Sequence, residues 1–92
     1  MNRLLIVLQS TSPERTYPEF EDLVRGTVPH EDDCFLMPLT CIVRSKFTAE
    51  DIGAVLREKV NKEDRIIVAP LSEERWYAHN AQAVDDCFDT WP

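Results

Sequence analysis

The arrangement of four short apolar runs around two stretches of helical periodicity constrains the fold of this chain most. Branched and aliphatic residues dominate the runs, which have the lengths of β-strands and span 3–9, 34–39, 40–45 and 65–71. A break near Pro38 or Leu39 separates the two middle runs, because proline cannot donate a hydrogen bond within a central strand. The pattern predicts four strands, of which the second and third form an antiparallel pair.

Two helices are expected between these strands. Residues 17–25 follow a capping box that starts at Thr16, carry their apolar side chains on one helical face and end at Gly26. The second helix has the clearer start, because Thr48 caps it and acidic residues fill its first turn. Its apolar residues repeat at helical spacing as far as Val60, and the polar residues around Val60 mark its end.

The resulting order is strand, helix, strand, strand, helix, strand, which is the split βαβ order of a ferredoxin-like fold. We therefore expect an α+β core over residues 1–71, with a four-stranded antiparallel sheet and both helices on one face. Residues 72–92 form a C-terminal extension of the same single domain, and its apolar spacing indicates a short helix around Val84. A chain of 92 residues has room for only one thin core.

Both faces of this sheet are expected to be apolar. Side chains alternate along a strand, so Leu4 and Ile6 share one face while Leu5 and Val7 share the other. Helices on one face cannot cover both, so either the extension folds back over the second face or a second subunit packs there. We favour a homodimer. The expected dimer or partner interface consists of Leu5, Val7, Ile67, Trp76, Tyr77 and Trp91.

The charge of the chain argues against general nucleic-acid binding. Seventeen acidic and ten basic residues give a net charge of −7, whereas nonspecific binding depends on Lys and Arg contacts to phosphates. Only a local basic patch would permit a weak contact, and the residues for it are Arg44, Lys46 and Arg65. Glycine-rich phosphate-binding motifs are absent from the sequence.

The cysteines and the hydropathy indicate an intracellular protein. Cys34, Cys41 and Cys87 are odd in number, lack CxxC spacing and have apolar neighbours, so we expect buried, reduced thiols. The longest apolar run, residues 4–8, has five residues, far fewer than the roughly 20 that span a bilayer. We expect a cytoplasmic protein without a targeting signal or membrane contact.

No catalytic, metal or cofactor site is expected. Residues 30–33, His-Glu-Asp-Asp, are ligand types, but consecutive side chains point in different directions, so a solvated acidic loop is the favoured interpretation. His79 lies near Trp76 and Tyr77 without a nucleophile at a recognised spacing, so it is expected to be a packed or surface residue.

The segment 40–71 resembles a known family. It carries Cys-Ile-Val-Arg-Ser at 41–45, Thr-Ala-Glu-Asp-Ile at 48–52 and Asp-Arg-Ile-Ile-Val-Ala-Pro-Leu at 64–71. These runs are similar to the SinR-like family. The resemblance implies a small, often dimeric, ferredoxin-like domain, related in fold to the small CRISPR-associated nuclease and integrase subunit, in a family whose members mostly lack an assigned activity.

One departure from the nuclease relatives matters for function. In those relatives an Asp ends the first strand, where two subunits would present carboxylates to a divalent metal. Here Gln9 and Ser10 occupy that place, and neutral side chains do not supply the missing charge. We therefore expect a non-enzymatic, homodimeric interaction protein that binds a protein partner, in a sharper form as an inhibitor or nucleic-acid mimic. The alternative, by fold analogy, is a metal-dependent nuclease or nucleic-acid-binding protein.

Overall fold

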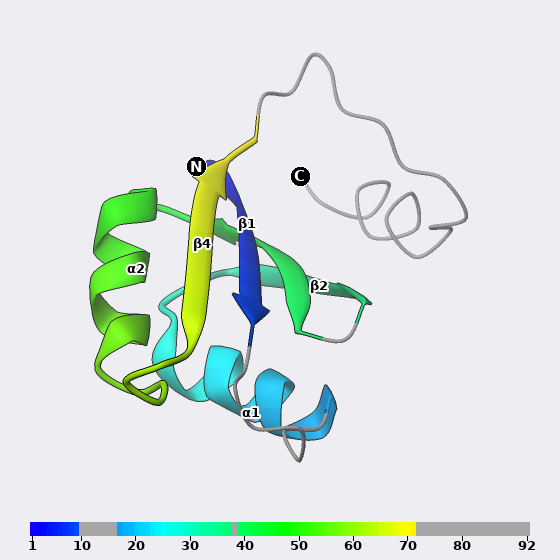
Figure 1. The fold of residues 1–92 in the computed structure, drawn as a ribbon. Helices are drawn as coiled ribbons and strands as arrows, with labels where there is room; N and C mark the ends of the chain where they lie inside the picture. The colour runs from blue at the N-terminus through cyan, green and yellow to red at the C-terminus, as the bar shows by residue number, and fades with distance from the viewer. Residues whose placement is uncertain (10–16, 38, 72–92) are drawn as a thin grey trace.

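The computed structural model describes residues 1–9, 17–37 and 39–71 of the chain, and its elements follow the predicted order (Figure 1). These elements are β1 (Asn2–Gln9), α1 (Tyr17–Thr27), β2 (Asp32–Met37), β3 (Thr40–Ser45), α2 (Ala49–Arg57) and β4 (Arg65–Pro70). The extension, 72–92, and the helix expected around Val84 lie outside the described residues.

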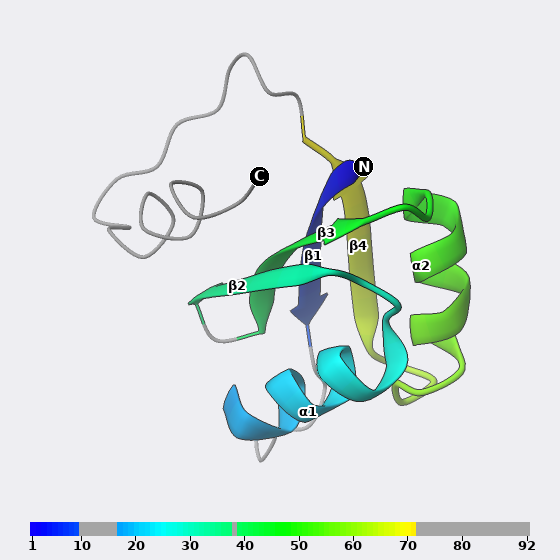
Figure 2. The same ribbon diagram turned by 180° about the vertical axis from the view of Figure 1, so that it is seen from behind.

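The strands form one antiparallel sheet in the order β2-β3-β1-β4, which places the first strand of the chain in the interior of the sheet. Both helices pack on the same face, as the two opposite views show (Figure 2). The α+β, ferredoxin-like fold predicted from the order of the elements is therefore confirmed.

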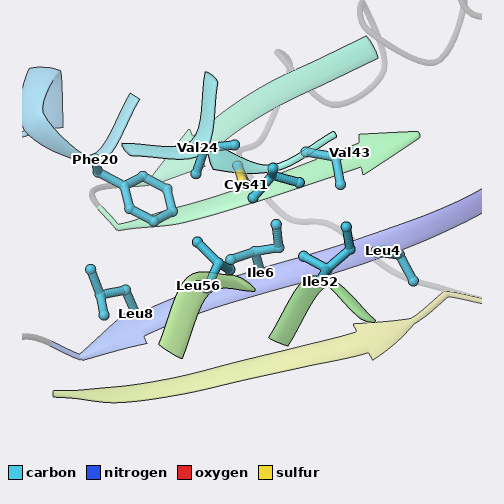
Figure 3. Close-up of a cluster of buried hydrophobic side chains, with 10 residues drawn as sticks. Leu4, Ile6, Leu8, Phe20, Val24, Cys41, Val43, Ile52 and Leu56 are labelled. Carbon is cyan, nitrogen blue, oxygen red and sulfur yellow. The ribbon is translucent and has the colours of Figure 1, made fainter. Parts of the chain in front are cut away.

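The hydrophobic core lies between this face and the helices (Figure 3). Alternate residues of β1 point into it, and Leu4, Ile6 and Leu8 are at most 4% exposed. The remaining fully buried core side chains come from the helices and β3, namely Phe20, Val24, Ile52, Leu56, Cys41 and Val43. Apolar side chains that recur every two residues along the strands and every 3.6 residues along the helices thus pack together in this one core.

The start of α2 is as predicted, but its end is not. Thr48 Oγ1 accepts a hydrogen bond from the Asp51 backbone N–H at 3.2 Å, and Asp51 Oδ2 accepts one from the Thr48 backbone N–H, which completes a capping box. The helix ends at Arg57, and after it the Lys59 N–H donates to the Leu56 carbonyl at 2.9 Å, an i→i−3 bond of the kind that tightens the last turn of a helix. Val60 still packs against the core although it follows the helix, so the spacing of apolar residues in the sequence predicts a longer helix than the structure has.

Helix α1 runs two residues further than expected. Gly26 was predicted to stop it, but the helix continues to Thr27 and no described glycine has a positive φ. The Val28 N–H bonds to the Val24 carbonyl at 2.9 Å, and the buried Val28 side chain holds this last turn on the core. The packing of Val28 on the core therefore extends the helix beyond Gly26, the residue at which the sequence predicts its end. The expected cap at Thr16 lies outside the described residues.

The β2–β3 hairpin corrects the interpretation of the acidic stretch. β2 begins at Asp32, not at Cys34, so two of the four residues expected in a solvated loop belong to the sheet. The predicted break is confirmed at Leu39, which adopts φ 62° and whose carbonyl accepts the Leu8 N–H at 2.9 Å. A leucine in the left-handed region is unusual, and this bond to β1 together with packing against the core holds it there.

Candidate interaction surface

The sheet face opposite the helices carries an apolar strip along β1 and β4. The antiparallel register sets Leu5 opposite Ala69 and Val7 opposite Ile67, all on the side away from the core. We call these four residues the β1–β4 strip. Leu5 and Val7 are half-buried, whereas Ile67 is 61% exposed, which is unusual for a large aliphatic side chain in a sheet.

The other half of the same face, along β2 and β3, has a different exposure. Cys34 pairs with Ile42 across the hairpin, and Ile42 pairs with Leu5 of β1, so the side chains of Cys34 and Ile42 also point away from the helices. Nevertheless, Cys34 is only 3% exposed and Ile42 only 2%. On the face opposite α1 and α2, the side chains of β1 and β4 are therefore partly or largely exposed, whereas those of Cys34 in β2 and Ile42 in β3 are buried.

The residues expected at an interface are brought together only in part. Leu5, Val7 and Ile67 form one contiguous surface in the β1–β4 strip. The aromatic residues Trp76, Tyr77 and Trp91 lie outside the described residues, as does His79.

The three basic residues considered for nucleic-acid contact do not gather. Arg44 lies opposite Arg3 and Arg65 opposite Gln9, so six residues of β1, about 20 Å, separate them. Arg44 Nε also donates to Asp32 Oδ2 at 2.6 Å. Lys46 places its ammonium 5.6 Å from the centre of the Phe47 ring. The structure thus provides no shared basic patch from these side chains.

A charged cluster that the sequence interpretation did not foresee joins the end of α1 to β2. Arg25 donates from Nε and Nη2 to the two carboxylate oxygens of Asp33, each at 3.2 Å, and its guanidinium lies 5.1 Å from the centre of the Phe35 ring. His30 Nε2 lies 2.8 Å from Asp33 Oδ2. The Asp33 carboxylate therefore contacts both Arg25 of α1 and His30 of the loop before β2.

The hydrogen bonds of His30 define what this cluster does. Its Nδ1 lies 2.6 Å from the Val28 carbonyl oxygen and its Nε2 faces the Asp33 carboxylate. Both partners are acceptors, so the doubly protonated ring donates to both, whereas a neutral ring donates to only one. The His30 side chain is 9% exposed. With both nitrogens occupied, this histidine fastens the loop before β2 and is poorly placed as a general base.

The pKa of Asp33 reflects the same contacts. Partial burial on its own raises this pKa, but hydrogen bonds from Arg25 and His30, together with their positive charges, hold it below its usual value of 3.8. The carboxylate is thus a charged structural anchor at neutral pH.

The two described cysteines differ in chemical state. The expectation of reduced thiols is wrong for Cys34, which takes part in a disulfide, and is confirmed for Cys41, which is free and buried. Cys34 points away from the core, where its apolar sequence neighbours do not shield it, and this could not be read from the sequence. Cys87 lies outside the described residues.

Cys41 is expected to be unreactive in the folded protein. Burial, and to a lesser extent the charge of Asp33, raise the pKa of its thiol to about 12, so almost no thiolate exists at pH 8. Incubation of the native protein with iodoacetamide at pH 8 should leave Cys41 unmodified, while addition of denaturant should allow complete alkylation. Rapid labelling of Cys41 in the native protein, seen by peptide mass spectrometry, would contradict the burial described here.

Two further hollows lie on the surface of the described residues. A hollow between the end of α2 and the start of β4 is lined by both signs of charge, including Arg57, Glu58 and Lys62, and a smaller apolar hollow lies between Phe47 and Val55. Among residues 1–9, 17–37 and 39–71, no three ligand-type side chains are grouped so as to hold a metal ion. No helix in these ranges is long and apolar enough to cross a membrane.

Comparisons of the chain with protein families, with curated proteins and with solved structures find no match. The site is therefore interpreted from its own geometry. At the end of β1, Gln9 is exposed and pairs with Arg65, and Ser10 lies outside the described residues.

Proposed function

We propose that this protein is a small, non-enzymatic interaction protein that forms a homodimer through the β1–β4 strip and binds a protein partner. The observation that carries the proposal is the 61% exposure of Ile67 beside Leu5 and Val7 on the sheet face opposite α1 and α2. Burying such apolar surface contributes about 25 cal/mol per Å². A two-fold axis would place the same strip on both subunits, because an isologous interface is self-complementary.

The free edge of β4 favours packing by the face over pairing by the edge. The Leu71 N–H donates to the Arg3 carbonyl of β1 at 2.9 Å. Because successive N–H groups alternate in direction along a strand, residue 70 faces the outer edge, and this residue is Pro70, which has no N–H. The outer edge of β4 thus lacks one donor that an added strand would need.

The acidic charge supports a protein partner with a basic surface. A dimer would carry twice the net charge of −7, and such a field steers association with basic surfaces and opposes contact with phosphates. This charge is also what an inhibitor that mimics nucleic acid would need. The resemblance of segment 40–71 to the SinR-like family, which is often dimeric, is in keeping with this proposal.

Replacing Ile67 with lysine tests the interface. We expect Ile67→Lys to weaken dimerisation by on the order of 30-fold or more, because a charge would be placed at the centre of an apolar contact. The mass in solution, measured by light scattering during gel filtration over a range of concentrations, reports the change.

Val55→Lys is the matched control. Val55 is also a partly exposed aliphatic residue, at 38%, but it lies on α2, on the opposite side of the sheet. This variant should dimerise like the unchanged protein. A wild-type protein that remains at 10.7 kDa throughout the micromolar range, or equal effects of the two substitutions, would refute the proposed interface.

A further inference from the structure

An apolar hollow lies beside the start of α2, on the helix side of the sheet. Its volume is about 410 Å³, and an apolar cavity of about 150 Å³ already holds a benzene ring. Phe47 and Val55, at 36% and 38% exposure, are two of the four large hydrophobic side chains that are exposed among the described residues. The hollow is lined by Pro29, Phe47, Asp51, Ile52, Ala54 and Val55. The described residues therefore present a second apolar surface besides the β1–β4 strip.

Two walls of the hollow are held by a buried serine. The Ser45 hydroxyl donates to the Pro29 carbonyl at 2.6 Å and accepts a hydrogen bond from the Phe47 N–H at 3.1 Å. Ser45 is 1% exposed, so both bonds are shielded from water. The Asn2 side-chain amide also donates to the Phe47 carbonyl at 2.9 Å. The hollow is thus formed before a ligand arrives, and binding does not incur the entropy cost of ordering a flexible site.

The charge at the hollow is negative. Among its lining residues Asp51 alone carries a charge. Its Oδ2 accepts the Thr48 N–H, and a carboxylate has about four acceptor positions, so it can bind a further donor. The Lys46 ammonium lies 5.6 Å from the centre of the Phe47 ring, but Lys46 does not line the hollow. Glu50 adds an exposed carboxylate next to Asp51. A ligand with a positive charge beside its apolar group is therefore complementary to this site.

We propose that this hollow binds an aromatic side chain of the protein partner that has a lysine or arginine next to it in the partner's chain. The aromatic ring fills the space between Phe47 and Val55, and the neighbouring cation pairs with Asp51. Aromatic anchors in preformed pockets supply much of the affinity of protein interfaces. This inference rests on the proposed binding of a basic protein partner, and it names the site and the chemistry of that contact.

The hollow remains accessible in the proposed homodimer. Val55 lies on α2, whereas the β1–β4 strip lies on the opposite face of the sheet. A dimer that forms through the strip therefore carries two hollows, one on the outer side of each subunit.

Peptide titrations test the proposal. The probe is a fluorescein-labelled peptide with one tryptophan between two pairs of lysines, and its reference peptide has serine in place of the tryptophan. At about 0.15 M salt, we expect the full chain to bind the tryptophan peptide at least about tenfold more tightly than the serine peptide, as measured by fluorescence anisotropy. Equal affinities would overturn the hollow as the binding site and retain the basic partner. Absence of binding of either peptide at millimolar protein would overturn both.

Matched variants locate the site. Val55→Lys should remove the preference for the tryptophan peptide, whereas Ile67→Lys, in the strip, should retain it. Asp51→Asn keeps an oxygen for the Thr48 N–H and should weaken binding of the tryptophan peptide by about threefold. Glu50→Gln removes the same charge one residue away, outside the lining, and should change the affinity by less than about 1.5-fold. A preference that survives in Val55→Lys or disappears in Ile67→Lys would contradict the proposal.

The same samples separate this proposal from the homodimer. Light scattering reports the oligomeric state, and the ratio of the two peptide affinities reports the hollow. A monomeric wild-type protein that still prefers the tryptophan peptide would refute the dimer and support the hollow. If Val55→Lys does not fold, the two peptides and the comparison of Asp51→Asn with Glu50→Gln still decide the proposal.

Discussion

Phe20→Ala is expected to lower the free energy of unfolding by about 3–5 kcal/mol, the usual cost of removing a fully buried aromatic side chain. Phe20 is 0% exposed and meets Phe35 edge to face, with ring centres 5.7 Å apart. Its removal would take away that aromatic contact and one of the fully buried side chains that join α1 to the sheet. Small domains have only about 5–15 kcal/mol in total, so a large part of the molecules would unfold at moderate denaturant.

Urea titration followed by circular dichroism measures this loss. Val55→Ala is the control, because Val55 is a helical aliphatic residue that is 38% exposed, and we expect it to change the free energy of unfolding by less than about 1 kcal/mol. Equal losses in the two variants would mean that α1 is not packed on the sheet as described.

Asp33→Asn is expected to lower the stability at neutral pH by about 1–3 kcal/mol, because it removes charge-assisted hydrogen bonds to two partners. The substitution keeps the shape of the side chain, but an amide accepts through only one oxygen. Arg25 would lose its two-point contact and His30 the carboxylate that it faces. Asp32→Asn is the matched control on the same strand, and a smaller loss is expected because the Asp32 carboxylate accepts a hydrogen bond from Arg44 alone among the side chains described.

The pH dependence of the Asp33 contribution has a defined sign. The pKa of Asp33 is lower in the folded protein than its usual value of 3.8, so folding favours the charged form. The contribution is therefore fully present above the unfolded value and is lost as the pH falls through the folded pKa. Unfolding free energies measured from pH 7 down to pH 2 should show a shallower acid decline in Asp33→Asn than in the unchanged protein. Parallel acid declines would show that Asp33 does not stabilise the fold through its charge.

Patterns among residues close in the sequence were sufficient to predict the strands, the helices and the topology of the sheet. Alternation along β1 separated Leu4 and Ile6 from Leu5 and Val7, and the cap at Thr48 located the start of α2. These features depend on residues a few positions apart, where the period of the backbone decides the direction of each side chain. The order of elements then left few topologies to consider.

Features that depend on distant residues could not be predicted. Asp33 appeared to be one of several acids in a loop, and its role depends on α1 ending beside the start of β2. The end of α1 itself was set by the burial of Val28 and not by Gly26. The disulfide at Cys34 depends on which face that side chain occupies, and thus on the hairpin register. Each of these is a tertiary effect without a local pattern.

The interior position of β1 has a consequence for how the chain folds as it is synthesised. Of the described strands, β1 is synthesised before the others, but its partners are β3 and β4, and Leu4 pairs with Pro70 at the far end of the described fold. Its apolar residues therefore remain unpaired on the ribosome until most of the domain has emerged. Such long-range pairing slows folding, since loop closure precedes the contacts that stabilise it. A nascent chain that ends before β4 would expose one side of β1 as an open template for aggregation.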